Sequence, residues 1–231
     1  MTPLSPEELQ IIGLSLKVAL TATLFSLPPG IALAYLLSRY NFPGKALLSG
    51  LTHLPLVLPP VVTGYALLLL FGRNGPLGSW LEPMGIVFAF DWTGAALAAA
   101  VMGFPLLVRA VSLSFDMIDP RIERAAETLG ATPAVRFVTI TLPLALPGIA
   151  AGTVLAFAKA LGEFGATITF VSSIPGETRT LPLAIYSLTQ VPGGEAAALR
   201  LVLISVGVSI AALLVSEWVA RTAARRVGRV A

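Results

Sequence analysis

Long apolar runs, separated by short polar segments, form the main pattern of the chain. Each run is longer than the roughly 20 residues that a helix needs to cross the hydrocarbon core of a bilayer. A helix pairs its backbone groups within itself, which lipid requires of any single spanning segment. The pattern therefore predicts an all-α, polytopic membrane protein with about five transmembrane helices. The predicted spans are residues 10–38, 46–71, 93–115, 144–171 and 196–220.

Prolines and a polar loop modify this simple pattern. A Pro-Pro pair at residues 28–29 predicts a kink or a local unwinding in the first run. Three prolines between residues 55 and 60 disfavour regular helix there, so we expect a bent entry before straight helix from Val61. The loop 172–194 contains a moderately apolar stretch, residues 181–188, which predicts a re-entrant or surface helix rather than a span.

Composition supports the membrane assignment. The chain has 231 residues, of which 56% are hydrophobic and 12% are charged, whereas about a quarter of an ordinary soluble domain is charged. It has no cysteine and a single histidine, His53, which excludes disulfides, thiolate ligands and a zinc site of the usual kind. No metal or other cofactor is expected, and for His53 a packing or interface role is favoured over a proton relay.

The basic residues give the predicted orientation. The pI near 9.6 does not indicate nucleic-acid binding, because the bases lie at membrane boundaries, where the positive-inside rule explains them. With five spans, this rule places residues 1–9 outside and both the segment 116–143 and the basic tail 221–231 inside. The predicted inner bases are Arg39, Lys45, Arg121, Arg124, Arg136, Arg221, Arg225, Arg226 and Arg229, against Arg73, Arg179 and Arg200 outside.

The fourth run carries costly charges and a small-residue motif. Lys159 and Glu163 are four residues apart, so they share a helix face and can pair. Because charge inside a membrane helix is expensive, the pair is interpreted either as a structural ion pair or as part of a gate or pathway. We expect Lys159→Ala to harm assembly more than a reversal of both charges. The spacing of Gly148 and Gly152 favours close packing within the subunit over a dimer seam.

A polar island, Ile122 to Pro143, interrupts the apolar second half of the chain, and we call it the elbow. Its first part is rich in strong helix formers and predicts a helix that ends near Leu129. Gly130 follows at the point where a helix end favours a left-handed backbone. Thr132-Pro133 has the pattern of an N-cap with proline at the first helical position, which predicts a second short helix. Asp or Arg at position 130 is expected to crowd this corner.

The elbow resembles the cytoplasmic loop of ABC importer membrane subunits, which is written EAA-xxx-G-x9-I-x-L-P. Ala125-Ala126 and Gly130 match, and after nine residues Ile140-Thr141-Leu142-Pro143 completes the pattern. Arg124 occupies the glutamate position, and Glu123 stands one place earlier. Further stretches, GEFGATITF and IPGETRT among them, extend the resemblance over essentially the whole chain to the molybdate permeases of this family.

The resemblance implies a type I ABC importer permease in a bacterial inner membrane, with residues 1–9 in the periplasm. Two copies of the chain would form the pathway, cytoplasmic ATPases would bind the elbows, and a periplasmic binding protein would deliver the oxyanion. The chain itself is not expected to be an enzyme, because it lacks a phosphate-binding loop. The implied ATPase-coupling residues are Glu123, Arg124, Ala125, Ala126, Glu127, Leu129, Gly130, Ile140, Leu142 and Pro143.

Other functions stay open at this point. A sulfate or tungstate permease would share the same architecture. A stand-alone secondary transporter or channel would have no need of the elbow. An intramembrane enzyme is disfavoured, because the sequence contains neither HExxH nor another catalytic constellation.

Overall fold

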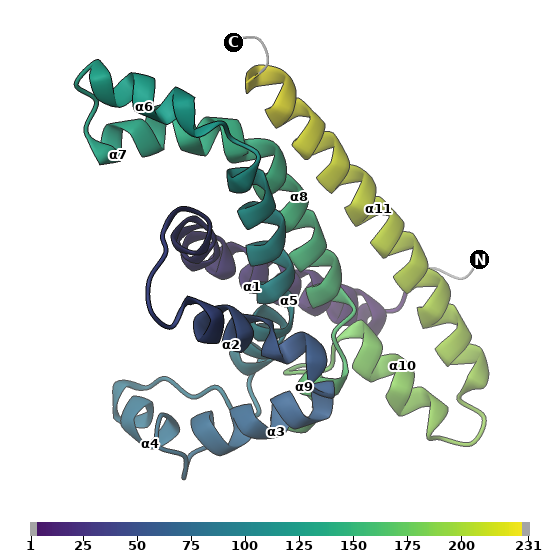
Figure 1. Ribbon diagram of the computed structural model, residues 1–231. Coiled ribbons are helices and arrows are strands. Elements are labelled where there is room, and N and C mark those ends of the chain that lie inside the picture. Colours follow the sequence, from purple (N-terminus) through teal and green to yellow (C-terminus); the bar gives the residue numbers. More distant parts are fainter. Residues whose placement is uncertain (1–3, 228–231) are drawn as a thin grey trace.

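The computed structural model describes residues 4–227, and within this range it contains helices and no strands (Figure 1). The predicted all-α fold class is therefore confirmed for the described part of the chain. The helices are α1 (Pro6–Arg39), α2 (Lys45–Val57), α3 (Pro60–Phe71), α4 (Gly78–Leu81), η1 (Glu82–Met84), α5 (Trp92–Asp116), α6 (Pro120–Thr128), α7 (Pro133–Arg136), η2 (Phe137–Thr141), α8 (Leu142–Leu161), α9 (Gly165–Val171), α10 (Leu181–Thr189) and α11 (Glu195–Val227).

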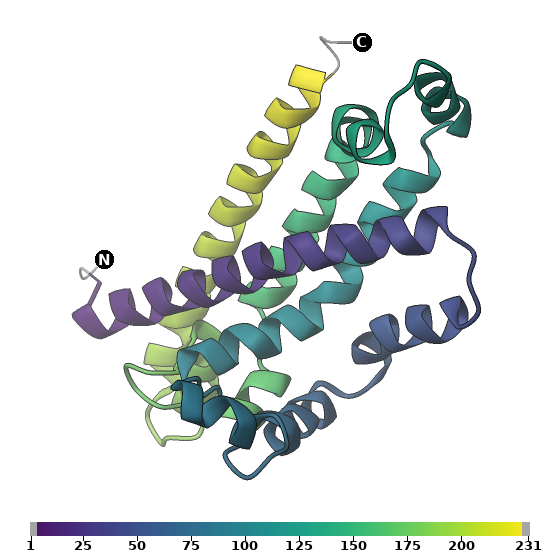
Figure 2. The same cartoon turned by 90° about the vertical axis from the view of Figure 1, so that its left-hand side faces the viewer.

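Helix α5 is the centre of the bundle. It contacts both α1 and α8 along much of its length, and in its alanine-rich first half Ala95 and Ala98 are completely buried. Small side chains allow helices to approach closely, which replaces the hydrophobic driving force that lipid does not supply. Figure 2 shows α1 crossing the face that α5 and α8 form. This packing sets where the two ends of α1 lie.

Helix α1 begins earlier than predicted and is not interrupted. Ser5 accepts a hydrogen bond from the Glu8 backbone N–H, while the Glu8 carboxylate accepts one from the Ser5 N–H, so a capping box defines the start. The helix then continues through Pro28 and Pro29 to Arg39, so the local unwinding considered for this pair does not occur. Gly30, directly after the prolines, is packed against Leu107 of α5, and such neighbours stabilise a helix that lacks two backbone donors.

The second predicted span is not one straight helix. Residues 46–71 form α2 and α3, which meet at an angle of 115°. Helix α2 includes Pro55 and ends at Val57, so regular helix forms where it was expected to be disfavoured, and the break lies at Leu58-Pro59. The reason is the following pair, Pro59-Pro60, because a residue before proline is driven out of the helical region. Neither half alone is long enough to cross a bilayer.

The fourth and fifth runs also differ from the predicted bounds. The run 144–171 is divided into α8 and α9 by a break at residues 162–164, and α9 packs against α3 instead of extending the span. The predicted helix in the loop 172–194 is confirmed as α10. Helix α11 continues to Val227, through most of the tail that was assigned to residues 221–231, and Arg229 lies outside the described residues. Four described helices are long and apolar enough to span, or five if α2 and α3 count as one.

The expected packing role of the fourth run's glycines within the subunit is confirmed. A Cβ atom built on Gly148 would lie 2.2 Å from the Ser114 Cβ, and one built on Gly152 would lie 3.1 Å from a Leu107 methyl group. Both contacts join α8 to α5, so the glycine surface is already occupied inside the monomer.

Gly148→Ala is expected to destabilise the bundle by about 1–3 kcal/mol, the usual cost of overpacking. The clashing Ser114 Cβ is attached directly to the backbone and cannot rotate away. Gly50→Ala is the matched control, because nothing lies within 4 Å of its added Cβ, and alanine favours a helix over glycine. The melting temperature of the purified protein in detergent checks this. Equal destabilisation of both variants would contradict the packing assignment.

Candidate functional site

The first helix of the elbow is built by local capping. Asp119 accepts a hydrogen bond from the Arg121 N–H at 2.8 Å, and Pro120 occupies the first helical position. At the other end, Gly130 adopts a left-handed backbone with φ of 87°. The Gly130 N–H bonds to the Glu127 carbonyl and the Ala131 N–H to the Ala126 carbonyl, both at 3.0 Å. These are the two bonds of a Schellman motif, which confirms the predicted role of Gly130.

The second helix of the elbow begins as predicted but does not end there. Thr132 caps α7 by accepting a hydrogen bond from the Val135 N–H, with Pro133 at the first helical position. The chain then continues through the π-helical turn η2 directly into α8. Figure 1 shows α7 lying across the top of the bundle and α8 descending from it. A movement of the elbow would therefore reach the membrane helix without an intervening loop.

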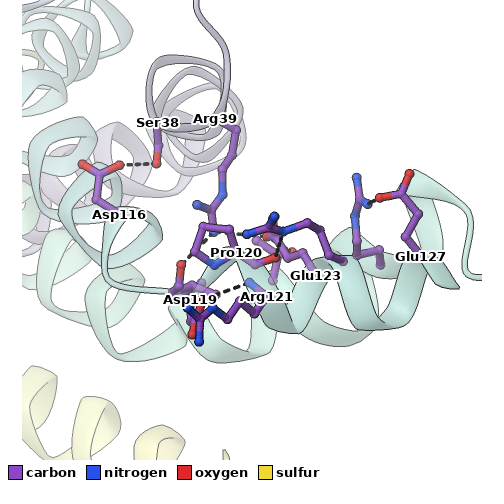
Figure 3. Close-up of polar contacts among 12 residues, drawn as sticks. Ser38, Arg39, Asp116, Asp119, Pro120, Arg121, Glu123 and Glu127 are labelled. Atoms are coloured by element: carbon purple, nitrogen blue, oxygen red, sulfur yellow. Dashed lines mark hydrogen bonds and ion pairs between the residues drawn. The ribbon is translucent and has the colours of Figure 1, made fainter. Parts of the chain in front are cut away.

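Glu123 points into the protein and joins α6 to α1 and to η2 (Figure 3). Its Oε1 accepts a hydrogen bond from Arg39 Nη2 at 3.2 Å and another from Thr141 Oγ1 at 2.7 Å. The side chains of Glu123 and Arg39 are only 12% and 15% exposed. Because the surrounding protein excludes most water, this charged pair is screened less than a surface pair.

The remaining coupling candidates divide into exposed and packed residues. Arg124 is exposed and bonds to the Pro120 carbonyl of its own helix, and the exposed Glu127 pairs with Arg136 at 3.0 Å. Leu129, at the tip, is 89% exposed. Ala126 is buried and Ala125 is exposed. Ile140, Leu142 and Pro143 are half-buried at the junction with α8.

The predicted intramembrane pair is present but lies at the opposite end of α8. Lys159 Nζ and Glu163 Oε2 are 2.6 Å apart, and the other Glu163 oxygen accepts a hydrogen bond from the Ala166 N–H at 3.0 Å. The Glu163 side chain is 2% exposed and that of Lys159 is 31% exposed. Glu163 thus closes the break between α8 and α9, which is a structural function, and the structure does not bring the pair to the elbow.

Three contributors to the elbow were missed in the sequence. Arg39 was read only as a base in an inner turn, and no sequence signal pairs it with Glu123, 84 residues away. The cap formed by Asp119 was also missed, although Asp119-Pro120 has the same N-cap pattern as Thr132-Pro133 and could have been recognised from it. Thr141 lies at the variable position of the I-x-L-P pattern, where nothing marks it.

Comparison with known sequences gives full-length relatives. The chain is 60% identical to the molybdenum transport system permease protein ModB of Escherichia coli strain K12, over 98% of this chain and 99% of that protein. It is 54% identical to ModB of Haemophilus influenzae, over 96% and 97% of the two chains. Identity to the sulfate transport system permease protein CysT of Escherichia coli strain K12 is 38%, over 80% of this chain and 67% of that protein.

Comparison with solved structures shows the fold. A bacterial ABC transporter that imports the acidic polysaccharide alginate superposes with a TM-score of 0.75 at 18% identity, over 95% of this chain and 80% of the other. A chain of an amino acid ABC transporter gives a TM-score of 0.64, also at 18% identity, over 96% and 94% of the two chains.

The family follows from a match that covers most of the sequence. The model of the binding-protein-dependent transport system inner membrane component family matches residues 26–228. This range includes the elbow, the central helix α5 and both halves of the fourth run. The chain therefore belongs to the family of inner membrane components of binding-protein-dependent transport systems.

Proposed function

We propose that this chain is the permease subunit of an ATP-driven importer and forms the membrane pathway for molybdate. The observation that carries this proposal is the 60% identity to a molybdenum permease over nearly the full length of both chains. The sulfate permease is more distant, at 38% identity over a smaller part of each chain. Tungstate, which shares the charge and tetrahedral shape of molybdate, is the second candidate for the same pathway.

The elbow is the proposed seat of a cytoplasmic ATPase. The chain has no phosphate-binding loop of its own, so ATP has to act through another subunit. Leu129 is 89% exposed, Val135 50% and Ile122 46%, on a helix pair that also carries charged side chains. Apolar side chains surrounded by charged groups are typical of a surface that a protein partner covers. Arg124 and Glu127 would surround this apolar contact.

Two copies of the chain and a binding protein complete the proposed assembly. None of the residues of α2 is buried, and Leu47, Leu51 and Val57 on this helix are each more than half exposed. A second copy of the chain is the partner proposed to cover this surface. The elbow and the carboxyl end of α11 lie at the same end of the bundle (Figure 1). This supports a cytoplasmic location for both, by the positive-inside rule.

The pathway itself needs only transient contacts with the oxyanion. We expect selectivity to lie in the periplasmic binding protein, and we assign no residue of this chain to the substrate. Lys159 is the one charged member of the fourth run that would attract an anion, but its Nζ is already bonded to Glu163. A structural role for this pair is therefore preferred over a gate.

The proposal is tested with the assembled transporter in liposomes. Molybdate-loaded binding protein is expected to stimulate ATP hydrolysis, and sulfate-loaded binding protein is not. Stimulation by sulfate-loaded and not by molybdate-loaded binding protein would replace molybdate with sulfate as the substrate. Oxyanion uptake by this chain alone, without ATPase or binding protein, would indicate a secondary transporter or channel and would contradict the proposal.

A further inference from the structure

Of the two acidic residues in the elbow, Glu123 is held inside the subunit. The proposed ATPase would instead contact the exposed residues of the elbow. Glu123 Oε1 accepts hydrogen bonds from α1 and from η2 at the same time, through Arg39 Nη2 and Thr141 Oγ1. Figure 3 shows the Arg39 side chain reaching from the end of α1 towards α6. A carboxylate that is 12% exposed and has two partners within the chain is poorly placed to contact another protein.

Further contacts join the same elements. Ser38 Oγ donates a hydrogen bond to the Asp116 carboxylate at the end of α5. Beside this network the rings of Tyr35 and Phe137 lie 4.8 Å apart, and those of Tyr35 and Phe115 lie 5.5 Å apart, in edge-to-face contact. Such aromatic pairs contribute beyond the area they bury. The end of α1 is therefore attached to α5, α6 and η2 together.

The other end of α1 is attached just as specifically. Glu8 pairs with Arg200 of α11 at 2.9 Å, and Glu7 pairs with Arg179 at 3.7 Å, directly before α10. Ser15 Oγ also accepts a hydrogen bond from the Leu181 N–H at 2.8 Å. Because α1 is an unbroken helix of 34 residues, it spans about 50 Å between these two attachments.

We propose that Glu123, Arg39 and Thr141 form a latch that makes the elbow and α1 move as one body. The latch transmits a displacement of the elbow along α1 to α10 and α11 at the far end of the bundle. In this arrangement Glu123 and Arg39 are positioning residues, and neither contacts the ATPase or the oxyanion. The inference rests on the proposed function, because it assigns a route to the ATP-driven movement of the elbow.

The test measures coupling and ATPase binding separately in the reconstituted transporter. The coupling ratio is the ATPase rate with molybdate-loaded binding protein divided by the rate without it. Glu123→Ala and Arg39→Ala are each expected to lower this ratio about fivefold, at the lower end of typical coupling between sites. The ATPase subunit should still copurify with each variant as it does with wild type. The double variant should lose clearly less coupling than the two single losses combined, because both single variants remove the contact between Arg39 and Glu123.

Threonine variants supply a matched control. Thr141→Val removes the hydroxyl that bonds to Glu123 and keeps the shape of the side chain. Thr153→Val removes a hydroxyl that donates a hydrogen bond to the Ile149 carbonyl of its own helix. The first is expected to lower the coupling ratio and the second to leave it unchanged. Glu123→Gln retains an acceptor oxygen and should retain more coupling than Glu123→Ala. Together with the two threonine variants, it tests the latch even if Glu123→Ala does not fold.

Three results would overturn the latch: unchanged coupling in the Glu123, Arg39 and Thr141 variants, additive losses in the double variant, or loss of ATPase binding by Glu123→Ala. The last would make Glu123 a docking residue. The proposed function fails separately, if the wild-type transporter shows no stimulation by molybdate-loaded binding protein. A stimulated wild type with normally coupled variants contradicts the latch alone.

Discussion

Gly130→Val is expected to lower ATP-driven molybdate uptake by at least about tenfold, because it forces a β-branched residue into a left-handed backbone. Gly130 has φ of 87° and ends α6 through two backbone hydrogen bonds. Relieving the strain requires the corner to change conformation, which breaks these bonds and displaces Leu129, the most exposed apolar residue of the elbow. Uptake into liposomes that contain the assembled transporter measures the effect.

The physical reason for this effect differs from the one expected from sequence. Crowding of the corner by Asp or Arg was expected, but a Cβ added to Gly130 has nothing within 4 Å. Backbone conformation is therefore the constraint, and Gly130→Asn should be the mildest substitution, because asparagine tolerates a left-handed backbone. Gly130→Asn with as little uptake as Gly130→Val would contradict this account.

A second glycine separates general strain from a defect of the elbow. Gly193 lies in the turn between α10 and α11, with φ of 82° and nothing within 4 Å of an added Cβ. Gly193→Val carries the same backbone strain outside the elbow and should keep most of its uptake. Similar losses of uptake in the Gly130 and Gly193 variants would show that the elbow has no special role in coupling.

Lys159→Ala is expected to destabilise the protein by about 3–5 kcal/mol, the usual cost of leaving a buried charge without its partner. The Glu163 side chain is 2% exposed, so water cannot replace the lost ammonium group. A large fall in melting temperature in detergent and loss of assembled transporter are the expected results. Normal stability with abolished uptake would instead indicate a pathway role for Lys159.

The hydrogen bond that Glu163 accepts from the Ala166 N–H determines which second substitution best restores stability when Lys159 is replaced. Reversing both charges would place a lysine at position 163, where it cannot accept the hydrogen bond from the Ala166 N–H. The variant with both charges reversed should therefore recover less of the stability lost in Lys159→Ala than was expected from the pairing of Lys159 and Glu163 alone. Lys159→Met combined with Glu163→Gln removes both charges and keeps an acceptor oxygen for Ala166, so it should recover most of the lost stability. Failure of this combination would contradict the interpretation that an unpaired charge causes the defect.

Local patterns in the sequence were reliable where the structure depends on neighbouring residues. The left-handed Gly130, the Thr132 cap and the contact between Lys159 and Glu163 each involve positions within four residues of one another, and all three are present. Helix α10 was also predicted from its apolar stretch. The roles of the coupling residues towards an ATPase, and the bounds of the membrane domain, stay predictions.

Contacts between distant segments could not be predicted in the same way. Arg39 and Glu123 are 84 residues apart, and the apolar pattern says nothing of which inner turn lies beside which. At Pro28-Pro29 and again at Pro55 the sequence suggested a loss of regular helix, but helix continues through both. The bend expected before straight helix from Val61 is present, between α2 and α3. A proline removes a backbone donor in every case, but packing on neighbouring helices decides whether the helix continues.

The sequence by itself determined that this protein is an all-helical membrane subunit with a capped, charged elbow. Hydrophobic length and capping act over one to a few helical turns, so a linear pattern is enough to reveal them. Only the tertiary structure decided that Glu123 faces inward and that α1 joins the elbow to α10 and α11. The physical reason is that a side chain's partner depends on how helices pack, and this packing brings together residues that no local spacing relates.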